Sequence, residues 1–579
     1  MPSPPAPPTT SPPDAEDPFL LSDEVVEAVA ALRPVTATFW GVAGHDGEWD
    51  DLRPEGHERA RAALASFEAR AATAAAGAAR DGDPWRRLAA DVLVDFLRVE
   101  LGRYTHRDHL TDLNTLASPL QLLTMAFDVM PSGTPEAWEA RASRLEGLPA
   151  ALEGYRATLA LGLASGEVVA ARQVRAVLAQ CAVHAGHASF VRSLGRQLAE
   201  SKLDDPSLSA RVEAAIPRVC DAFAAFAAWL GETYLPGARE ADGVGRARYV
   251  REAQRFLGMS IDPEETYAWG WREIAALRER LGEAAARLSP AESVAEVLER
   301  LKAAPDYAAP SLEVFLERMR ARQREALDQL GGVHFDVPAP VRTLDVKAAP
   351  PGGPIGVYYT APSEGFARPG CVWYSLGDAA ASGPVPMFDH VATAYHEGFP
   401  GHHLQIGIQL SLTDRLSRLH RVAEGYSGYA EGWALYAEEL MAELGYYERP
   451  EYLVGMLSCQ MIRACRIVLD IGAHLALPIP EGQPFHPGEA WTFELGVEML
   501  TELGGLLPDR AASEMVRYLG WPGQAIAYKV GQRVFLELRD AERARLGAAF
   551  DPKAFHAKVL GSGNVGLDRL CRGVTGARP

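Results

Sequence analysis

The chain has 579 residues, of which 48% are hydrophobic and 23% are charged, a composition typical of a globular protein with a large core. Its formal net charge of −19 argues against the basic surface that binds nucleic acids and anionic membranes, so we expect neither as a partner. The six cysteines are widely scattered and too few for a disulfide framework.

The first segment, residues 1–18, reads MPSPPAPPTTSPPDAEDP. It has neither the basic region nor the apolar region of a signal peptide. A segment so rich in proline cannot build a core, and we predict a disordered tail. No apolar run later in the chain approaches the ~18–20 residues that span a bilayer. Together these observations predict a cytoplasmic protein.

Three stretches of different composition follow the tail. Residues 19–330 are rich in Ala, Leu, Arg and Glu, with apolar residues at three- and four-residue spacing, which predicts a series of helices. Residues 331–383 contain many prolines, glycines, β-branched residues and aromatics, which predicts a small β-sheet of short strands. Helical periodicity returns in residues 384–579. Because no linker divides these stretches, we predict a single, mainly α domain over residues 19–579.

The segment TAYHEGFPGHHLQ, residues 393–405, begins like the zinc-hydrolase motif H-E-x-x-H. On a regular helix this motif directs two histidines at one metal ion and the glutamate toward the metal-bound water. His396 and Glu397 supply the first half, so Glu397 is the candidate general base. Pro400 occupies the position of the second histidine. Since proline cannot continue a regular helix, it predicts a kink or a bulge at this turn.

Two histidines follow this proline. In an unbroken helix His403 would lie about 10 Å along the axis from His396, which is too far for both to bind one ion. A bulge of two residues within 398–401 would instead bring His402 to the position of the second ligand. We predict that His402 binds the metal and that His403 supports the site or stabilises the transition state; the opposite assignment of the two stays open.

A third ligand is expected from a separate helix, SGYAEGWALYAEEL, residues 427–440. Glu431 lies there among small and apolar residues, where a carboxylate is costly unless it is paired or binds a cation. The neighbouring Gly432 would allow another helix to approach closely. Glu438 follows two turns later on nearly the same face, from which it could orient a metal-binding histidine.

A later helix, residues 461–475, places Arg466, Asp470 and His474 on one face. The row could line a cleft, or it could be a ladder of ion pairs within the helix. In the first case Arg466 would bind a substrate carboxylate and His474 would stabilise an oxyanion.

A last helix, residues 521–542, carries Tyr528 and Arg539. The tyrosine hydroxyl is a candidate oxyanion donor, although a core tyrosine would show the same pattern. Arg539 is a second candidate for binding a substrate carboxylate.

Four segments carry a family resemblance. They are HEGFPGHHLQ (396–405), AEGWALYAEEL (430–440), RIVLDIGAH (466–474) and PGQAIAYKVGQ (522–532). On these motifs the chain resembles the DUF885 proteins, a bacterial domain of unknown function grouped with the zincin-type metallopeptidases. The resemblance covers nearly the whole chain after the tail and implies a large, helical, zincin-like metallopeptidase fold.

Two finer resemblances concern the site. The residues AEGWA are similar to the NEG-aromatic-A box of gluzincin peptidases, whose glutamate binds zinc, and this implies the same role for Glu431. The short strands before the active-site helix resemble the edge-strand element with which such peptidases hold an extended substrate. Tyr374, in this part of the chain, is therefore a candidate substrate-binding residue.

The sequence as a whole predicts a zinc-dependent hydrolase of a peptide or small amide. One Zn²⁺ would be bound by His396, His402 and Glu431, and Glu397 would act as general base. One alternative is a metal-dependent hydrolase of non-peptide amides or esters, or a tailoring enzyme of small-molecule biosynthesis. Another is a helical binding protein without catalytic activity. No oligomeric state is predicted.

Overall fold

The computed structural model describes residues 16–201, 203–349, 356–376, 383–423 and 425–576. Residues 1–15 of the predicted tail lie outside this range, as do parts of the predicted β segment. The first helix begins at Pro18 and is capped by the carboxylate of Asp17.

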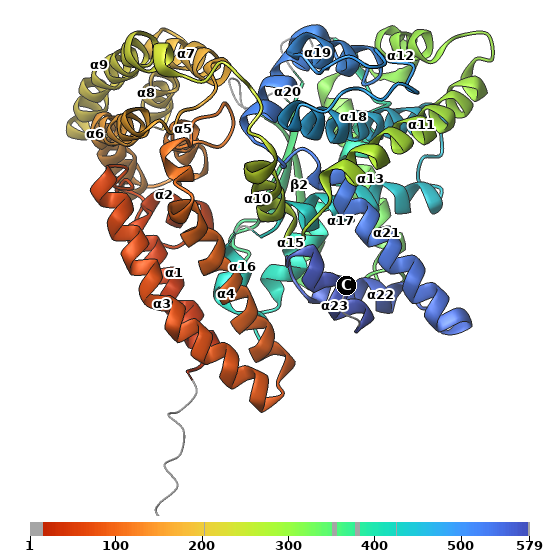
Figure 1. Ribbon diagram of the computed structural model, residues 1–579, viewed down its shortest axis with the longest axis horizontal. Coiled ribbons are helices and arrows are strands. Elements are labelled where there is room, and N and C mark those ends of the chain that lie inside the picture. Colours follow the sequence, from red (N-terminus) through yellow and green to blue (C-terminus); the bar gives the residue numbers. More distant parts are fainter. Residues whose placement is uncertain (1–15, 202, 350–355, 377–382, 424, 577–579) are drawn as a thin grey trace, which may run out of the picture.

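The N-terminal half of the chain is helical throughout. It consists of α1 (Pro18–Leu32), α2 (Pro34–Trp40), α3 (Pro54–Asp81), α4 (Pro84–Thr105), α5 (Pro119–Val129), α6 (Pro135–Ser165), α7 (Ala171–Ala185), α8 (Phe190–Glu200) and α9 (Pro206–Trp229). Most of these helices begin with proline in the first turn. Proline is tolerated there because the N–H groups of the first turn have no partner within the helix. Figure 1 shows them gathered on one side of the molecule, in red to yellow.

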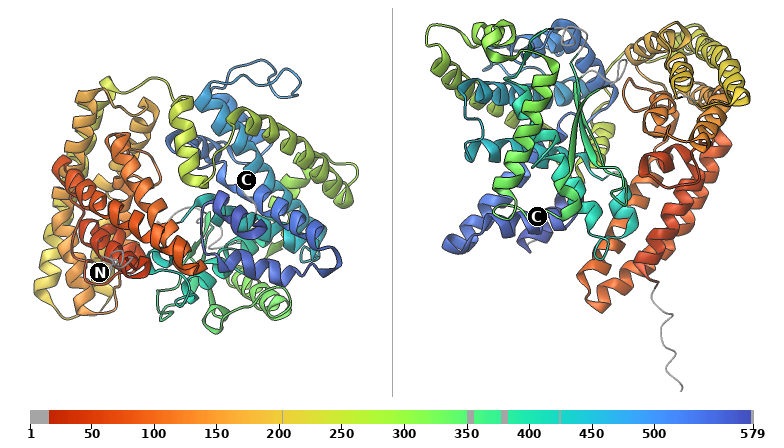
Figure 2. Two further views of the ribbon diagram at one scale, coloured as in Figure 1. Left: turned by 60° about the horizontal axis from the view of Figure 1, so that its bottom comes forward. Right: turned by 180° about the vertical axis from the view of Figure 1, so that it is seen from behind.

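The C-terminal half contains the strands and the candidate site. Its helices are α10 (Arg246–Leu257), α11 (Pro263–Leu288), α12 (Val294–Ala303), α13 (Leu312–Leu330), α14 (His390–Glu397), α15 (His402–Ser411), α16 (Arg418–Val422), α17 (Ser427–Glu443), α18 (Pro450–Leu475), α19 (Phe493–Glu502), α20 (Pro508–Gly520), α21 (Ala527–Leu546), α22 (Pro552–Gly561) and α23 (Leu567–Thr575). The two views of Figure 2 keep this half beside the N-terminal helices. The prediction of a mainly α fold is confirmed.

A small mixed sheet precedes α14, as predicted. Its strands are β2 (Leu344–Ala348), β3 (Gly356–Thr360) and β4 (Gly370–Ser375), in the order β2-β4-β3. β2 pairs with β4 in parallel, and β3 pairs with β4 antiparallel. A separate two-stranded pair joins β1 (Ala308–Ala309) to β5 (Val385–Pro386). The middle strand β4 is therefore enclosed, and β2 and β3 form the edges of the three-stranded sheet.

The hydrophobic core consists of three clusters. The largest fills the C-terminal half, and the other two lie mostly among the N-terminal helices. Leu419 of α16 belongs to the cluster formed by α1, α3 and α4, so this short helix joins the two halves. The chain thus has several cores rather than one.

Two helical segments among the described residues are long and apolar enough to cross a membrane, by length and composition alone. They are Pro206–Gly237, with 33% of its apolar window buried, and Pro450–Leu475, with 67% buried. Neither segment is an uninterrupted apolar run, because Arg218 and Asp221 interrupt the first and Arg463 and Arg466 the second, so the expectation of no such run is not contradicted. Core helices pass the same test, and α18 packs against α11 and α14 in the largest cluster.

Three glycines bring the backbones of α17 and α21 into contact. A Cβ atom on Gly432 would lie 2.5 Å from the backbone of Gly531, and one on Gly531 would lie 2.0 Å from the carbonyl oxygen of Gly428. No larger residue fits at this crossing. The contact places Glu431, beside Gly432, close to the start of α21, where Tyr528 lies.

We expect Gly432→Ala to destabilise the protein by about 1–3 kcal/mol, because the methyl group would push α17 and α21 apart. The matched control is Gly282→Ala in α11, where a Cβ atom meets nothing within 4 Å. The control should raise stability by up to about 1 kcal/mol, because alanine favours helix. Urea denaturation midpoints compare the two; equal midpoints would contradict the close crossing.

Candidate metal centre

The helix that begins the H-E motif stops at Glu397, and a new helix starts at His402. The predicted bulge is therefore wrong in form, because the chain breaks into two helices joined by residues 398–401. This linker contains a cis peptide bond between Phe399 and Pro400. It turns back tightly, since a Cβ atom on Gly401 would lie 1.9 Å from the carbonyl oxygen of His396.

Two side chains from other helices hold this turn. Gln323 of α13 accepts a hydrogen bond from the backbone N–H of Phe399 at 2.7 Å and donates one to the carbonyl of Ala394 at 2.7 Å. The indole of Trp433 on α17 donates to the carbonyl of Pro400 at 2.9 Å. The turn is thus tied to both neighbouring helices, and its shape determines where the second histidine lies.

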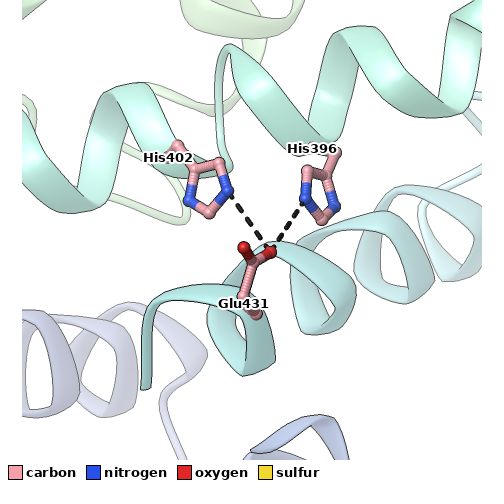
Figure 3. A group of neighbouring side chains, drawn as sticks. All are labelled: His396, His402 and Glu431. Carbon is pink, nitrogen blue, oxygen red and sulfur yellow. Dashed lines mark ion pairs between the residues drawn. The ribbon is translucent and has the colours of Figure 1, made fainter. Parts of the chain in front are cut away.

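The structure brings His396, His402 and Glu431 together. Figure 3 shows the two imidazole rings, from α14 and α15, directed at the carboxylate on α17. Glu431 Oε2 lies 3.3 Å from His396 Nε2 and 3.6 Å from His402 Nε2. The three ligand atoms all lie within 4.8 Å of one another, and among the described residues no other group of three or more histidines, cysteines or acids does so. The side chains are 4%, 13% and 19% exposed, in the order named.

These distances suit a divalent cation. Ligand atoms at about 2.0–2.1 Å from a tetrahedral zinc ion are separated by about 3.3 Å. Glu431 Oε2 is also buried without a hydrogen bond among the described residues, a costly state for a carboxylate oxygen unless a cation is bound. Two imidazoles and one carboxylate are a common ligand set of catalytic zinc sites.

His396 is oriented from behind by Glu438, as predicted for this glutamate. Its Nδ1 donates to Glu438 Oε1 at 2.8 Å, while Gln460 donates to the other oxygen at 2.8 Å and Arg463 lies 3.4 Å away. Burial lowers the pKa of His396, but the adjacent carboxylates of Glu431 and Glu438 outweigh it and raise the pKa to about 9. The pocket therefore favours positive charge at this position, from a proton or from a cation.

Glu397 follows the first histidine and ends α14. Burial raises the pKa of this carboxyl group, and the neighbouring histidines oppose the shift. Tyr374 lies near enough for the charge of Glu397 to raise the pKa of its hydroxyl, after burial itself. Tyr374 is on the enclosed strand β4 and packs against Phe315 and His390. Almost fully buried, it backs the site rather than facing a substrate.

Tyr528 lies near Glu431, and Arg466 lies against the Tyr528 ring. The Arg466 guanidinium carbon is 4.6 Å from the centre of the Tyr528 ring. Burial and then the charge of Glu431 raise the pKa of the Tyr528 hydroxyl, which therefore stays protonated and able to donate. Of the row predicted on α18, the structure brings Arg466 toward the site.

His403 is turned away from the cluster. Its Nε2 donates to the carbonyl of Val341 at 2.7 Å, and its Nδ1 accepts from the Tyr359 hydroxyl at 2.9 Å. Both ring nitrogens are thus occupied in structural contacts. Because His403 follows His402 directly on α15, it points to another face of that helix.

Two further candidates also lie elsewhere. His474 donates to the carbonyl of Tyr518 at 3.1 Å and lies on α18 about 12 Å beyond Arg466. Arg539 forms two hydrogen bonds, of 2.8 and 2.9 Å, with Glu443 and lies about 16 Å along α21 from Tyr528. Both fill structural roles because their helices run away from the cluster.

Sequence reasoning missed Arg463 and Arg517. Arg463 precedes Arg466 by three residues and therefore shares its helix face, a spacing visible in the sequence. Arg517 is on α20, and no motif marks it; only the packing of α18 against α20 brings it near Arg466.

Comparison with known proteins places the chain in a family. Residues 34–574 match the family described as "Bacterial protein of unknown function (DUF885)". The chain is a DUF885 protein. No curated protein matches it.

Two solved structures share the DUF885 fold of this chain. One is the crystal structure of a "putative lipoprotein" from Colwellia psychrerythraea, with a TM-score of 0.84 and 24% identity over 97% of this chain and 99% of that one. The other is a "putative lipoprotein of unknown function" from Shewanella oneidensis, with a TM-score of 0.71 and 16% identity over 95% and 98%. At these identities the likeness concerns the fold alone.

We expect His402→Ala and Glu431→Gln to abolish stoichiometric binding of a divalent ion, because each removes one of three ligands. The control is His187→Ala, which removes an exposed histidine of the N-terminal half. Metal analysis after dialysis against zinc should find one ion per chain in wild type and control. Equal metal content in all four proteins would contradict the assignment.

A second prediction concerns Asp470, which accepts hydrogen bonds from Tyr249 and from the backbone of Gly523. Burial raises the pKa of its carboxyl group to about 7. The folded protein therefore keeps a proton that the unfolded chain loses near pH ~4, so this group costs stability as the pH rises from about 4 to about 7.

Asp470→Asn removes this cost. The difference in urea midpoint, variant minus wild type, should increase between pH 4 and pH 7 and stay constant above pH 7. Asp509→Asn, at an exposed aspartate, is the control and should show no such trend. A difference for Asp470→Asn that is independent of pH would refute the raised pKa.

Proposed function

We propose that this DUF885 protein is a metal-dependent hydrolase of peptide or small amide bonds. The observation that carries the proposal is the cluster of His396, His402 and Glu431 with Glu397 beside it. Three ligand atoms within 4.8 Å of one another would leave one position of a tetrahedral metal ion free for water, and the carboxyl group of Glu397 lies near enough for His396, His402 and Glu431 to shift its pKa. A purely structural site commonly binds its metal with four protein ligands.

Each group has a distinct task in this proposal. A zinc ion, when bound, lowers the pKa of its water and polarises the substrate carbonyl. Glu397 accepts the proton of that water and passes it to the leaving nitrogen; its burial, which raises its pKa, suits both steps. The Tyr528 hydroxyl donates to the oxyanion of the tetrahedral intermediate. Arg466, stacked on the Tyr528 ring, keeps the phenol in place and adds a positive charge beside it.

The sheet supplies a way to hold an extended substrate. β3 is an edge strand and packs against α14, which carries His396 and Glu397. A peptide could therefore pair with the outer side of β3 by backbone hydrogen bonds and pass the cluster. Since β4 is enclosed, this role falls to β3 and not to the strand of Tyr374.

The cellular location enters the same proposal. The predicted cytoplasmic location stays a prediction, and the description of both similar structures as lipoproteins speaks against it. Cell fractionation of the native host, with an antibody to this protein, decides between cytoplasm and envelope. The substrate follows from the answer, because cytoplasmic and envelope peptides differ.

Glu397→Gln tests the mechanism. We expect kcat/KM on a cleaved peptide to fall about 10²–10⁴-fold, because the amide cannot accept the water's proton. Bound metal should remain, since Glu397 is not a ligand. Glu283→Gln, at an exposed glutamate of α11, is the matched control and should keep wild-type activity.

The substrate screen should contain peptides, N-acyl amides and esters. Cleavage of amides or esters without cleavage of any peptide would favour the non-peptide alternative. If Glu397→Gln hydrolyses its substrate at the wild-type rate, the proposed role of this glutamate is wrong.

A further inference from the structure

Three arginines lie near the candidate metal cluster: Arg466 lies against the Tyr528 ring, Arg463 is 3.4 Å from Glu438, and Arg517 shares Glu514 with Arg466. Arg463 and Arg466 are on α18, and Arg517 is on α20. Burial and the charge of Glu431 raise the pKa of the Tyr528 hydroxyl, and the positive charge of each of these arginines opposes that rise. Three guanidinium groups therefore share one small region beside the candidate active site.

The acids in this region do not balance the arginines. Glu514 lies 3.1 Å from Arg466 and 3.4 Å from Arg517, so one carboxylate serves two guanidinium groups. Arg463 lies 3.4 Å from Glu438, but that carboxylate already accepts hydrogen bonds from His396 and Gln460. An excess of positive charge at this place contrasts with the net charge of −19 of the chain.

Several donors of these arginines are unused. Arg463 Nε and Arg517 Nε are buried and make no hydrogen bond among the described residues, and Arg517 Nη2 has only the 3.4 Å contact with Glu514. Buried donors without acceptors are costly, and a guanidinium fork suits a carboxylate. The side chains of Arg463, Arg466 and Arg517 are still 14%, 12% and 17% exposed, so part of each is accessible to solvent.

The distance from the cluster limits where the ligand's carboxylate can be. The guanidinium carbon of Arg466 lies 4.6 Å from the centre of the Tyr528 ring, and Arg463 lies 3.4 Å from Glu438 Oε1, which accepts a hydrogen bond from His396. One side chain, Glu438, thus separates the candidate metal ligand His396 from the nearest arginine. One or two residues of extended chain, at ~3.3–3.6 Å each, cover this span.

We propose that Arg463, Arg466 and Arg517 form a carboxylate-binding subsite, and that the substrates carry a carboxylate one or two residues beyond the scissile amide. The inference rests on the proposed hydrolase function. It makes the protein an enzyme that cleaves short peptides or removes residues next to a carboxylate, in preference to cutting long chains internally.

The test compares one peptide in three forms: with a free C-terminal carboxylate, with a C-terminal amide, and with a C-terminal amide and an aspartate after the scissile bond. Wild type should cleave the free acid with a kcat/KM about 10–100-fold higher than the amide, as expected for buried hydrogen bonds to a charged group. Restored cleavage of the aspartate peptide would assign the subsite to an acidic side chain as well. Equal rates on acid and plain amide would overturn the proposal.

The Arg517→Gln variant tests the subsite itself. It should reduce the ratio of kcat/KM on the free acid to kcat/KM on the amide toward one, whereas Arg517→Lys should retain part of this preference. Arg533→Gln is the matched control, because this arginine is on α21 close to Tyr528 in sequence but exposed and paired with Glu537. An unchanged ratio in folded Arg517→Gln, with the circular dichroism of wild type, would refute the role of Arg517.

A binding measurement separates this inference from the proposed function. N-acetyl-dialanine and its C-terminal amide are titrated calorimetrically into zinc-loaded Glu397→Gln protein, which need not turn over. About 10–100-fold tighter binding of the acid, lost in Glu397→Gln/Arg517→Gln, supports the subsite even if wild type hydrolyses no peptide. Equal affinity for acid and amide refutes the subsite even if wild type is an active peptidase.

Discussion

A carboxylate held against two imidazoles is the interaction around which the site is arranged. Glu431 Oε2 lies 3.3 and 3.6 Å from the ring nitrogens of His396 and His402; it is buried and makes no hydrogen bond within the part of the chain that the structure describes. In water each of these groups would be solvated, so gathering them inside the protein costs free energy unless a cation is shared. Binding a divalent ion returns that free energy, and metal binding should therefore also stabilise the fold.

The surrounding helices serve to hold these three groups in place. The turn of residues 398–401 reverses the chain so that the second histidine lies beside the first, and Gln323 and Trp433 fix that turn from α13 and α17. The glycine crossing of α17 and α21 sets Glu431 against Tyr528. From α18, Gln460 and Arg463 contact Glu438, which in turn orients His396. Each helix contributes one or two polar side chains to an otherwise apolar core.

Charge within the site changes sign over a short distance. The candidate ligand Glu431, with Glu438 and Glu397, concentrates negative charge, which raises the pKa of His396 against the effect of burial. Close to Tyr528, the arginines of α18 and α20 concentrate positive charge. A cation bound at the cluster would attract the carbonyl oxygen of a ligand, and the arginines would attract a carboxylate at its other end. Net charge, which is strongly negative for the chain, gives no indication of this local pattern.

The sequence by itself determined the helical fold, the small sheet before α14, and the ligand candidates His396, His402 and Glu431, because helical periodicity and ligand spacing are local properties. Family resemblance and the cost of a buried charge indicated Glu431, and helical spacing indicated Glu438. Only the tertiary structure decided that His403 faces Val341 and Tyr359, that His474 and Arg539 lie far along their helices, and that Arg517 comes near the site. A side chain's partners depend on how helices distant in sequence pack, and a pattern on one helix gives the face but not the neighbour that covers it.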